Sequence, residues 1–172
     1  MRSVTVADVV GDWFAVVDTA QNPNLHALVT KSEQHECLVS GDIPPVLEAT
    51  LPYVVRMQTG EPLSDAWRQT GVGQNWGILL QSTLPIDQLR SHFKKFLNAK
   101  LPDGTIALFR FYDPRVFRTY MRAAQPEERD PWFRGIARFS VESEQVGLFH
   151  DFRLEAGQLF DGPQPVTGFA HG

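Results

Sequence analysis

Cys37 is the first side chain whose chemistry deserves a test, because His35 lies two residues before it. Residues two apart on a strand point to the same face, so an imidazole at this spacing can take the proton of a thiol. A cysteine nucleophile also needs a group that orients its base, and the neighbouring sequence identifies none. The serines lie in no G-x-S-x-G motif. We therefore expect a structural cysteine and no catalytic residue.

The glycines at positions 71, 73 and 77 have the spacing G-x-G-x-x-x-G, which resembles a phosphate-binding loop. The segment follows an expected helix and precedes an expected strand, whereas a dinucleotide-binding loop follows a strand and precedes a helix. Glycines that end a helix account for the same spacing. We therefore predict a turn.

Histidines are potential metal ligands, but they are scattered along the chain, at positions 26, 35, 92, 150 and 171. The sequence has no H-E-x-x-H motif and no pair of cysteines, and a zinc site needs three or four converging ligands. We expect no metal site and no cofactor.

Three arginines, Arg115, Arg118 and Arg122, fall on one side of an expected helix. At 100° per residue they lie within about 60° of arc, away from the apolar side of that helix. Such a basic stripe can bind an acidic surface of a partner protein, and it is also typical of a solvated helix face. We favour the solvated face and keep the stripe as a candidate for partner binding.

The elements around these residues are clearest in the segment 103–115. An Asp-Gly turn leads into Ile106–Phe111, whose apolar residues on both faces predict a strand in the middle of a covered sheet. Asp113 and Pro114 follow as the expected N-cap and first residue of a helix. These signals predict a turn, a buried strand and a capped helix.

Arg110 places a charge in this apolar strand. Burying an unpaired guanidinium is costly, so we expect an ion pair with Asp113 or Asp18. We assign a structural role to Arg110 and to the neighbouring Tyr112, Asp113 and Pro114.

Strand and helix patterns alternate up to about residue 125. The expected strands include 13–18, 36–40 and 76–81, and the expected helices include 62–70 and 85–98. A hairpin of 136–141 and 146–154 follows. The sequence thus predicts an α/β fold, a mixed sheet flanked by helices with a C-terminal β-hairpin, in a single domain over residues 1–155. Residues 156–172 show no periodicity and are expected to form a mobile tail.

The aromatic residues are concentrated in the C-terminal third, where 12 of the 19 follow residue 104. Trp132 and Phe133 lie between the helical part and the hairpin, and their residue types are enriched at protein interfaces. Phe149 and Phe152 lie in the last expected strand. Burial in a core is the favoured alternative for such residues, and these four stay candidates for partner binding.

Length and charge exclude several classes of protein. A chain of 172 residues fits one domain, and its net charge of −4 gives no general reason to bind nucleic acid or an anionic membrane. No apolar run approaches the roughly 18 residues of a membrane helix, and the first residues show no signal-peptide pattern. The single cysteine cannot form an internal disulfide. We expect a cytoplasmic bacterial protein with no nucleic-acid or membrane partner.

The string Phe-Arg-Phe-Tyr-Asp-Pro-Arg at residues 109–115 closely resembles the hallmark of the type VI secretion effector adaptor–chaperones, called Tap or Tec proteins. Other pieces agree in order: Trp-Phe-Ala-Val-Val-Asp, Leu-Pro-Tyr-Val-Val, Trp-Gly-Ile and a Leu-x-x-His-Phe-x-x-Phe-Leu helix. The likeness covers about residues 13–135. It implies a non-catalytic adaptor that binds a cognate toxic effector and helps to load it onto the VgrG spike protein. In such an adaptor the Phe-Arg-Phe-Tyr-Asp-Pro-Arg segment is mostly scaffold.

Two other functions stay open beside this leading prediction. A small α/β enzyme or nucleotide-binding domain would need a pocket lined by groups such as Arg110, Asp113, His35 and Cys37. An immunity protein would bind the same kind of toxin but would neutralise it.

Overall fold

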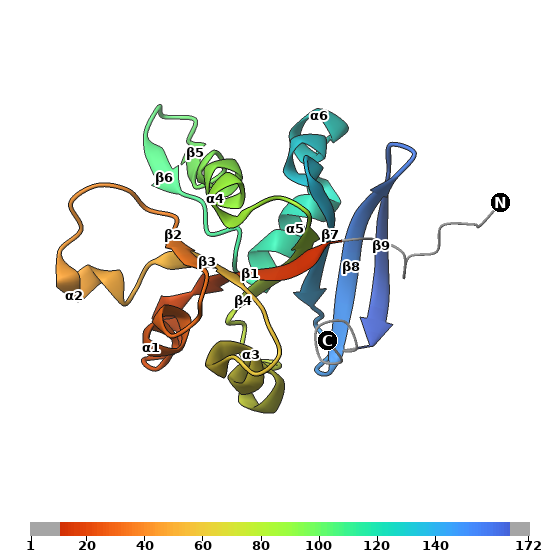
Figure 1. Cartoon of the computed structure of the whole chain (residues 1–172). Coiled ribbons are helices and arrows are strands. Elements are labelled where there is room, and N and C mark those ends of the chain that lie inside the picture. Colours follow the sequence, from red (N-terminus) through yellow and green to blue (C-terminus); the bar gives the residue numbers. More distant parts are fainter. Residues whose placement is uncertain (1–10, 166–172) are drawn as a thin grey trace.

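A computed structural model describes residues 11–165, and its centre is a seven-stranded sheet (Figure 1). The strands of this sheet are β1 (Asp12–Asp18), β2 (His35–Cys37), β3 (Pro52–Arg56), β4 (Gly77–Ser82), β7 (Ile136–Glu142), β8 (Leu148–Glu155) and β9 (Gln158–Pro165). Their order is β2-β3-β1-β4-β7-β8-β9. Strands β5 (Asn98–Lys100) and β6 (Ile106–Leu108) form a separate two-stranded sheet.

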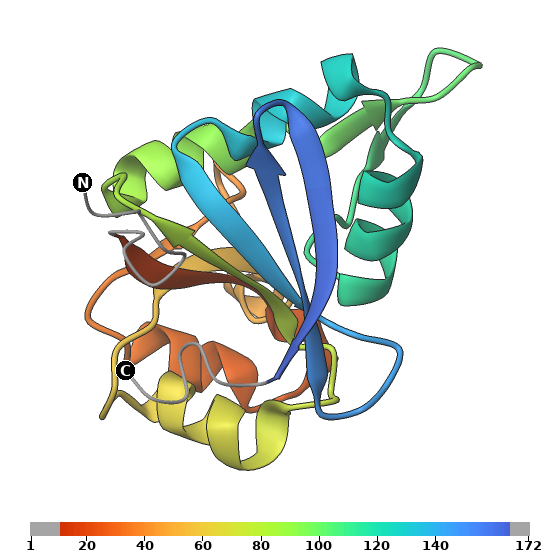
Figure 2. The same ribbon diagram turned by 90° about the vertical axis from the view of Figure 1, so that its right-hand side faces the viewer.

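Helices cover both faces of the large sheet (Figure 2). They are α1 (Leu25–Thr30), α2 (Pro45–Glu48), α3 (Pro62–Ala66), α4 (Ile86–Lys94), α5 (Pro114–Ala123) and α6 (Pro126–Arg129), with short helical turns at Thr19–Gln21, Trp67–Gly71 and Asp130–Phe133. One core lies between the sheet and helices α4 and α5, and a second lies between the sheet and helices α1 and α3. The predicted α/β class with flanking helices is confirmed.

Strand β1 shows why its sequence is apolar throughout. Phe14 and Val16 point into the core under α4 and α5, while Ala15 and Val17 point into the core over α1 and α3. Successive side chains of a strand alternate between faces, so a strand covered on both sides has no polar face. The strand predicted at residues 13–18 is confirmed.

Helix α5 begins where its sequence predicts. The Asp113 carboxylate accepts the N–H of Arg115 at 2.9 Å, and Pro114 is the first helical residue. An N-cap acceptor satisfies one of the N–H groups that a helix start leaves unpaired, and a proline at this position lacks only an N–H that the helix does not need. The helix buries Phe117 and Met121 against the sheet.

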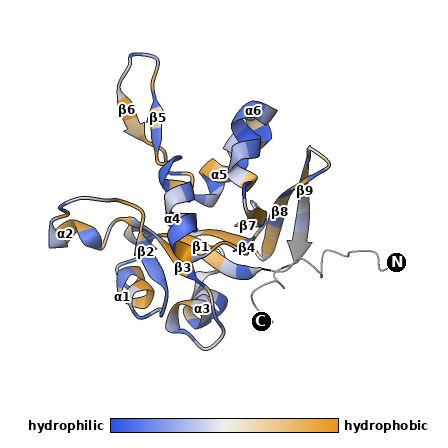
Figure 3. Ribbon diagram, turned by 45° about the horizontal axis from the view of Figure 1, so that its top comes forward, coloured by the Kyte–Doolittle hydropathy of each residue, from blue (hydrophilic) through white to orange (hydrophobic). Residues whose placement is uncertain are grey.

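The strand predicted at Ile106–Phe111 differs from the structure. Only Ile106–Leu108 forms a strand, β6, and it pairs with β5 in a hairpin that projects from the domain, as Figures 1 and 3 show. Phe111, the last residue of the predicted strand, lies instead in a turn after β6, where it is buried in the core with Leu89 and Phe93 of α4. The expectation of a buried strand in a covered sheet is therefore wrong. We call residues 98–108 the β5–β6 arm.

The C-terminal hairpin is confirmed as β7 and β8, but the chain continues into a further strand. Ala156 and Gly157 both have positive φ (50° and 77°), the backbone of a tight two-residue hairpin turn, and β9 pairs with β8 along its whole length. The expected mobile tail from residue 156 is thus a strand up to residue 165, and residues 166–172 lie outside the described part. All strand pairs of the described residues are antiparallel, which corrects the expected mixed directions.

Candidate functional site

Arg110 joins the end of the arm to the large sheet. Its guanidinium donates to the carboxylate of Asp18 at the end of β1, and that carboxylate is only 3% exposed. Asp18 also accepts the N–H of Ala20 and the side-chain amide of Gln21, each at 3.1 Å. The bond to Asp18 raises the pKa of Arg110. One of the two predicted partners is confirmed, and the contact is a structural anchor.

Tyr112 and Asp113 complete this anchor. Tyr112 is buried, and burial raises the pKa of its hydroxyl. Burial also opposes ionisation of Asp113, but bonds from Arg115 outweigh it and hold the pKa of the carboxyl below its ordinary value. The Arg115 Nε and Nη2 atoms lie 3.0 and 2.7 Å from the two carboxylate oxygens. These contacts agree with the structural role predicted for the motif.

The basic stripe on α5 is not a uniform solvated face. Arg118 is buried, donates to the backbone oxygen of Glu142 and lies 3.2 Å from a carboxylate oxygen of Glu144. Arg122 pairs with the same Glu144 at 2.9 Å and with Asp161 of β9 at 2.8 Å. The helix period placed these arginines correctly on one side, but it gave no sign that strands and a turn from the C-terminal region cover that side.

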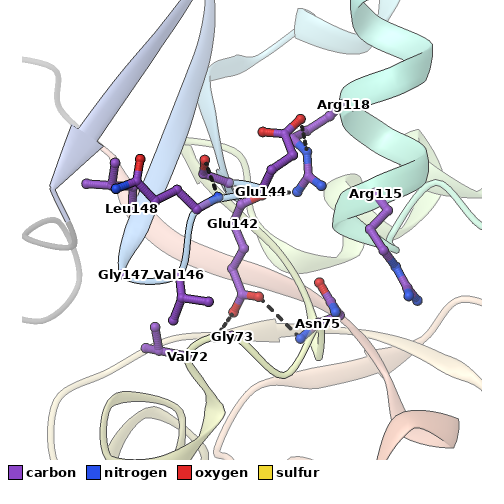
Figure 4. Close-up of a pocket in the computed structure, with 12 residues that line it drawn as sticks. Val72, Gly73, Asn75, Arg115, Arg118, Glu142, Glu144, Val146, Gly147 and Leu148 are labelled. Carbon is purple, nitrogen blue, oxygen red and sulfur yellow. Dashed lines mark hydrogen bonds and ion pairs between the residues drawn. The ribbon is translucent and has the colours of Figure 1, made fainter.

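The turn predicted at the glycines 71, 73 and 77 is confirmed, and two of its backbone N–H groups donate to a carboxylate of the protein itself. The Glu142 carboxylate accepts the N–H groups of Gly73 at 3.1 Å and of Asn75 at 3.2 Å, as Figure 4 shows. Gly73 and Asn75 both have positive φ, which turns their N–H groups toward the same point. Burial raises the pKa of Glu142 above its ordinary value, and the two N–H bonds act against that rise.

The other glycines of this loop are required by close packing. A Cβ atom at position 71 would lie 2.6 Å from the Trp76 ring, and one at Gly77 would lie 2.0 Å from the backbone oxygen of Val16. The glycine spacing that resembles a phosphate loop is therefore explained by the end of a helix at Gly71 and by the close contact of Gly77 with β1.

The pocket beside this turn has a volume of about 200 Å³. It lies between the Gly73 turn and the turn that joins β7 to β8, and Arg115, Arg118, Glu142 and Glu144 contribute its charged groups (Figure 4). Each of these groups has a partner within the protein, as described above. The charged groups around the pocket thus form internal ion pairs and hydrogen bonds that join α5, the turn before β4 and the β7–β8 hairpin.

The four aromatic candidates for partner binding lie in the core. Trp132, Phe133, Phe149 and Phe152 are all buried, and the Trp132 ring stacks on Phe96 at 4.0 Å between centroids. Their residue types are equally frequent in cores, and the sequence alone did not reveal the helices and strands that cover them. The described structure does not present them to a partner, which corrects that assignment.

His35 and Cys37 lie on the edge strand β2, both half-buried. The His35 Nδ1 atom is 2.9 Å from the backbone oxygen of Ser32. Cys37 lies opposite Tyr53 of the neighbouring strand β3, and burial together with Cys37 raises the pKa of Tyr53 to about 12. The His35 Nδ1 contact therefore goes to the backbone, and Cys37 packs beside a tyrosine. Within residues 11–165, no group of three or more His, Cys, Asp and Glu side chains can hold a metal ion.

The surface that sequence reasoning missed is the β5–β6 arm. Ile106 is 72% exposed, Leu108 is 55% exposed and Leu101, in the turn between the two strands, is 43% exposed. Figure 3 shows the arm standing away from the sheet with apolar residues on β6. Apolar residues in a strand usually signal burial, so the pattern concealed an exposed element. In the part of the chain that the structure describes, no helix is long and apolar enough to cross a membrane.

Comparison with protein-family models matches residues 13–131 to DUF4123, a domain of unknown function. The match runs from the second residue of β1 to beyond the end of α6, and it includes the whole arm and the Arg110 anchor. No significant match was found among curated proteins or among solved structures.

Proposed function

The chain belongs to the DUF4123 family, the Tap/Tec type that its sequence resembles, and from this premise we propose that it is a non-catalytic adaptor of type VI secretion. It binds a cognate toxic effector in the bacterial cytoplasm and helps to load that effector onto the VgrG spike protein.

The observation that carries this proposal is the exposed apolar surface of the β5–β6 arm. Three of the six exposed large apolar residues of the described chain lie on this one hairpin: Leu101, Ile106 and Leu108. Apolar groups that gather on the surface of a water-soluble domain are typical of a protein-binding site. The charged groups of the Figure 4 pocket support the same proposal, because each of them has a partner within the protein and holds elements together.

Co-expression tests the proposal. The chain is expressed with the proteins encoded next to its gene and with a VgrG subunit, and the purified material is examined for complexes of fixed stoichiometry. We expect a stable complex with a toxin and higher solubility of that toxin. An immunity protein would also form such a complex but would abolish the toxin's activity. Absence of any complex with toxin and spike would contradict the adaptor function.

A further inference from the structure

The free edge of β6 carries unpaired backbone groups. In the arm, the Phe109 N–H donates to the Leu97 oxygen at 2.6 Å and the Leu101 N–H donates to the Thr105 oxygen at 2.8 Å. Hydrogen-bonded pairs of an antiparallel ladder alternate with pairs whose N–H and C=O groups point outward. Ile106 and Leu108 fall on the outward positions of β6. Among the described strands, β6 pairs only with β5.

The side chains of the same two residues form an apolar face. Ile106 lies opposite Lys100 and Leu108 lies opposite Asn98, so all four point to one side of the arm. Ile106 and Leu108 are the most exposed large apolar residues of the arm. The arm therefore offers a free backbone edge and an apolar surface at the same place.

The edge strand β9 of the large sheet is protected in a way that β6 is not. It contains Pro163, which has no N–H to offer, and proline is a common means of preventing an edge strand from pairing with another chain. Strand β6 is short but contains no proline, so Ile106 and Leu108 both keep an outward N–H that can pair.

The charges near the arm indicate which charge a binding partner should carry. Residues 87–108 include two acidic residues, Asp87 and Asp103, and four cations, Arg90, Lys94, Lys95 and Lys100, so this segment has a net charge of +2. Arg90 and Lys94 bond to the Ser40 hydroxyl, and Lys95 borders a pocket of about 390 Å³ beside Arg134. No carboxylate of the described residues forms an ion pair with any of these four cations. The region is basic although the whole chain has a net charge of −4.

We propose that β6 binds an extended segment of a partner protein in which apolar and acidic residues alternate, and that this segment adds to the arm as a third strand. The partner segment forms backbone hydrogen bonds with Ile106 and Leu108. The side chains of these two residues contact the apolar residues of the segment, and the cations near the arm attract its acidic residues. This inference rests on the proposed adaptor function, since it names the chemistry of the effector or spike segment that binds.

A titration with two model peptides tests the inference without any knowledge of the natural partner. One peptide alternates valine with glutamate, and the other alternates valine with lysine. Amide resonances of the full chain are followed by NMR during each titration. We expect the acidic peptide to shift the resonances of Ile106 and Leu108, with at least tenfold weaker binding of the basic peptide.

Variants locate the binding. Ile106→Ser combined with Leu108→Ser should weaken binding of the acidic peptide at least tenfold, whereas Val146→Ser, at a residue that is 81% exposed elsewhere, should leave it unchanged. Thermal unfolding checks that the variants stay folded.

Three results would overturn the inference: equal affinity for the two peptides, no change in the amide resonances of the arm, or an equal loss of affinity in the Val146→Ser control. If the Ile106 and Leu108 resonances shift when only the protein concentration is raised, β6 pairs with a second copy of the chain, and the inference is also overturned. If the peptide result holds and no toxin complex forms, only the adaptor function fails.

Discussion

Arg110 donates a hydrogen bond to the buried carboxylate of Asp18, a residue 92 positions earlier in the chain. This contact fixes the base of the β5–β6 arm to the end of β1, while the arm itself projects from the sheet (Figure 1). The Phe-Arg-Phe-Tyr-Asp-Pro-Arg string thus positions the β5–β6 arm by anchoring the chain directly after it.

Replacing the anchor should lower stability. Arg110→Ala leaves the buried Asp18 carboxylate with one donor fewer, and because Arg110 is itself 47% exposed we expect a loss of about 1–3 kcal/mol in the free energy of unfolding. Urea unfolding measures it. The control is Arg56→Ala, which removes an ion pair with Asp12; because that carboxylate is 59% exposed and stays hydrated, the loss should be less than about 1 kcal/mol. Similar losses in the two variants would argue against an anchoring role.

The pKa of Glu142 should give the protein a distinct pH dependence. Burial raises this pKa above 4.5, so the folded state holds the proton more tightly than the unfolded state. The contribution of Glu142 to stability is therefore fully present below the unfolded pKa and is lost as pH rises through the folded pKa. Wild type should lose stability relative to Glu142→Gln as pH rises above about 4.5. Urea midpoints measured from pH 4 to pH 8 check the trend, and a constant difference between the two proteins would contradict it.

Glu144 should show the opposite sign. Its own backbone N–H and the Arg122 guanidinium lower the pKa of Glu144 from 4.5 to about 2. A lowered pKa stabilises the folded state above the unfolded pKa, and this contribution is lost as pH falls through the folded one. Wild type should therefore exceed Glu144→Gln in stability near pH 6, and the difference should vanish as pH falls from about 4.5 to about 2. Urea midpoints of the two proteins measured from pH 6 down to pH 2 check this, and a difference that persists at pH 2 would exclude this origin.

Gly77 should tolerate no larger residue. Gly77→Ala would place Cβ 2.0 Å from the backbone oxygen of Val16 in the neighbouring strand, and we expect a loss of about 3 kcal/mol. Gly60→Ala is the control, because Gly60 has positive φ but no atom within 4 Å of the added Cβ. There the backbone alone should cost about 1–2 kcal/mol. Thermal or urea unfolding distinguishes a steric cost from a backbone cost, and equal losses would contradict the close contact.

Local signals in the sequence predicted the elements they belong to. Asp113 and Pro114 define a helix start through their own chemistry, and Arg110 required a carboxylate, for which Asp18 was one of two choices. These predictions depend on neighbouring residues or on the cost of an unpaired charge, so they can be made from one chain.

Predictions that depended on what covers a residue were less reliable. Ile106 and Leu108 have the pattern of a buried strand, but apolar alternation does not say whether the covering layer belongs to the same chain. The turn before β9 was missed because Ala156 takes positive φ, a conformation that alanine rarely adopts and that its sequence does not announce.

Hydrogen exchange of the purified complex between the full chain and its effector tests the central claim most directly. If the chain is an adaptor that binds through the arm, the backbone N–H groups of Ile106 and Leu108 should exchange more slowly in the complex than in the free protein. The turn at residues 71–75, whose amides already bind Glu142, should be unchanged. Unchanged exchange in the arm together with slower exchange elsewhere on the surface would contradict the account.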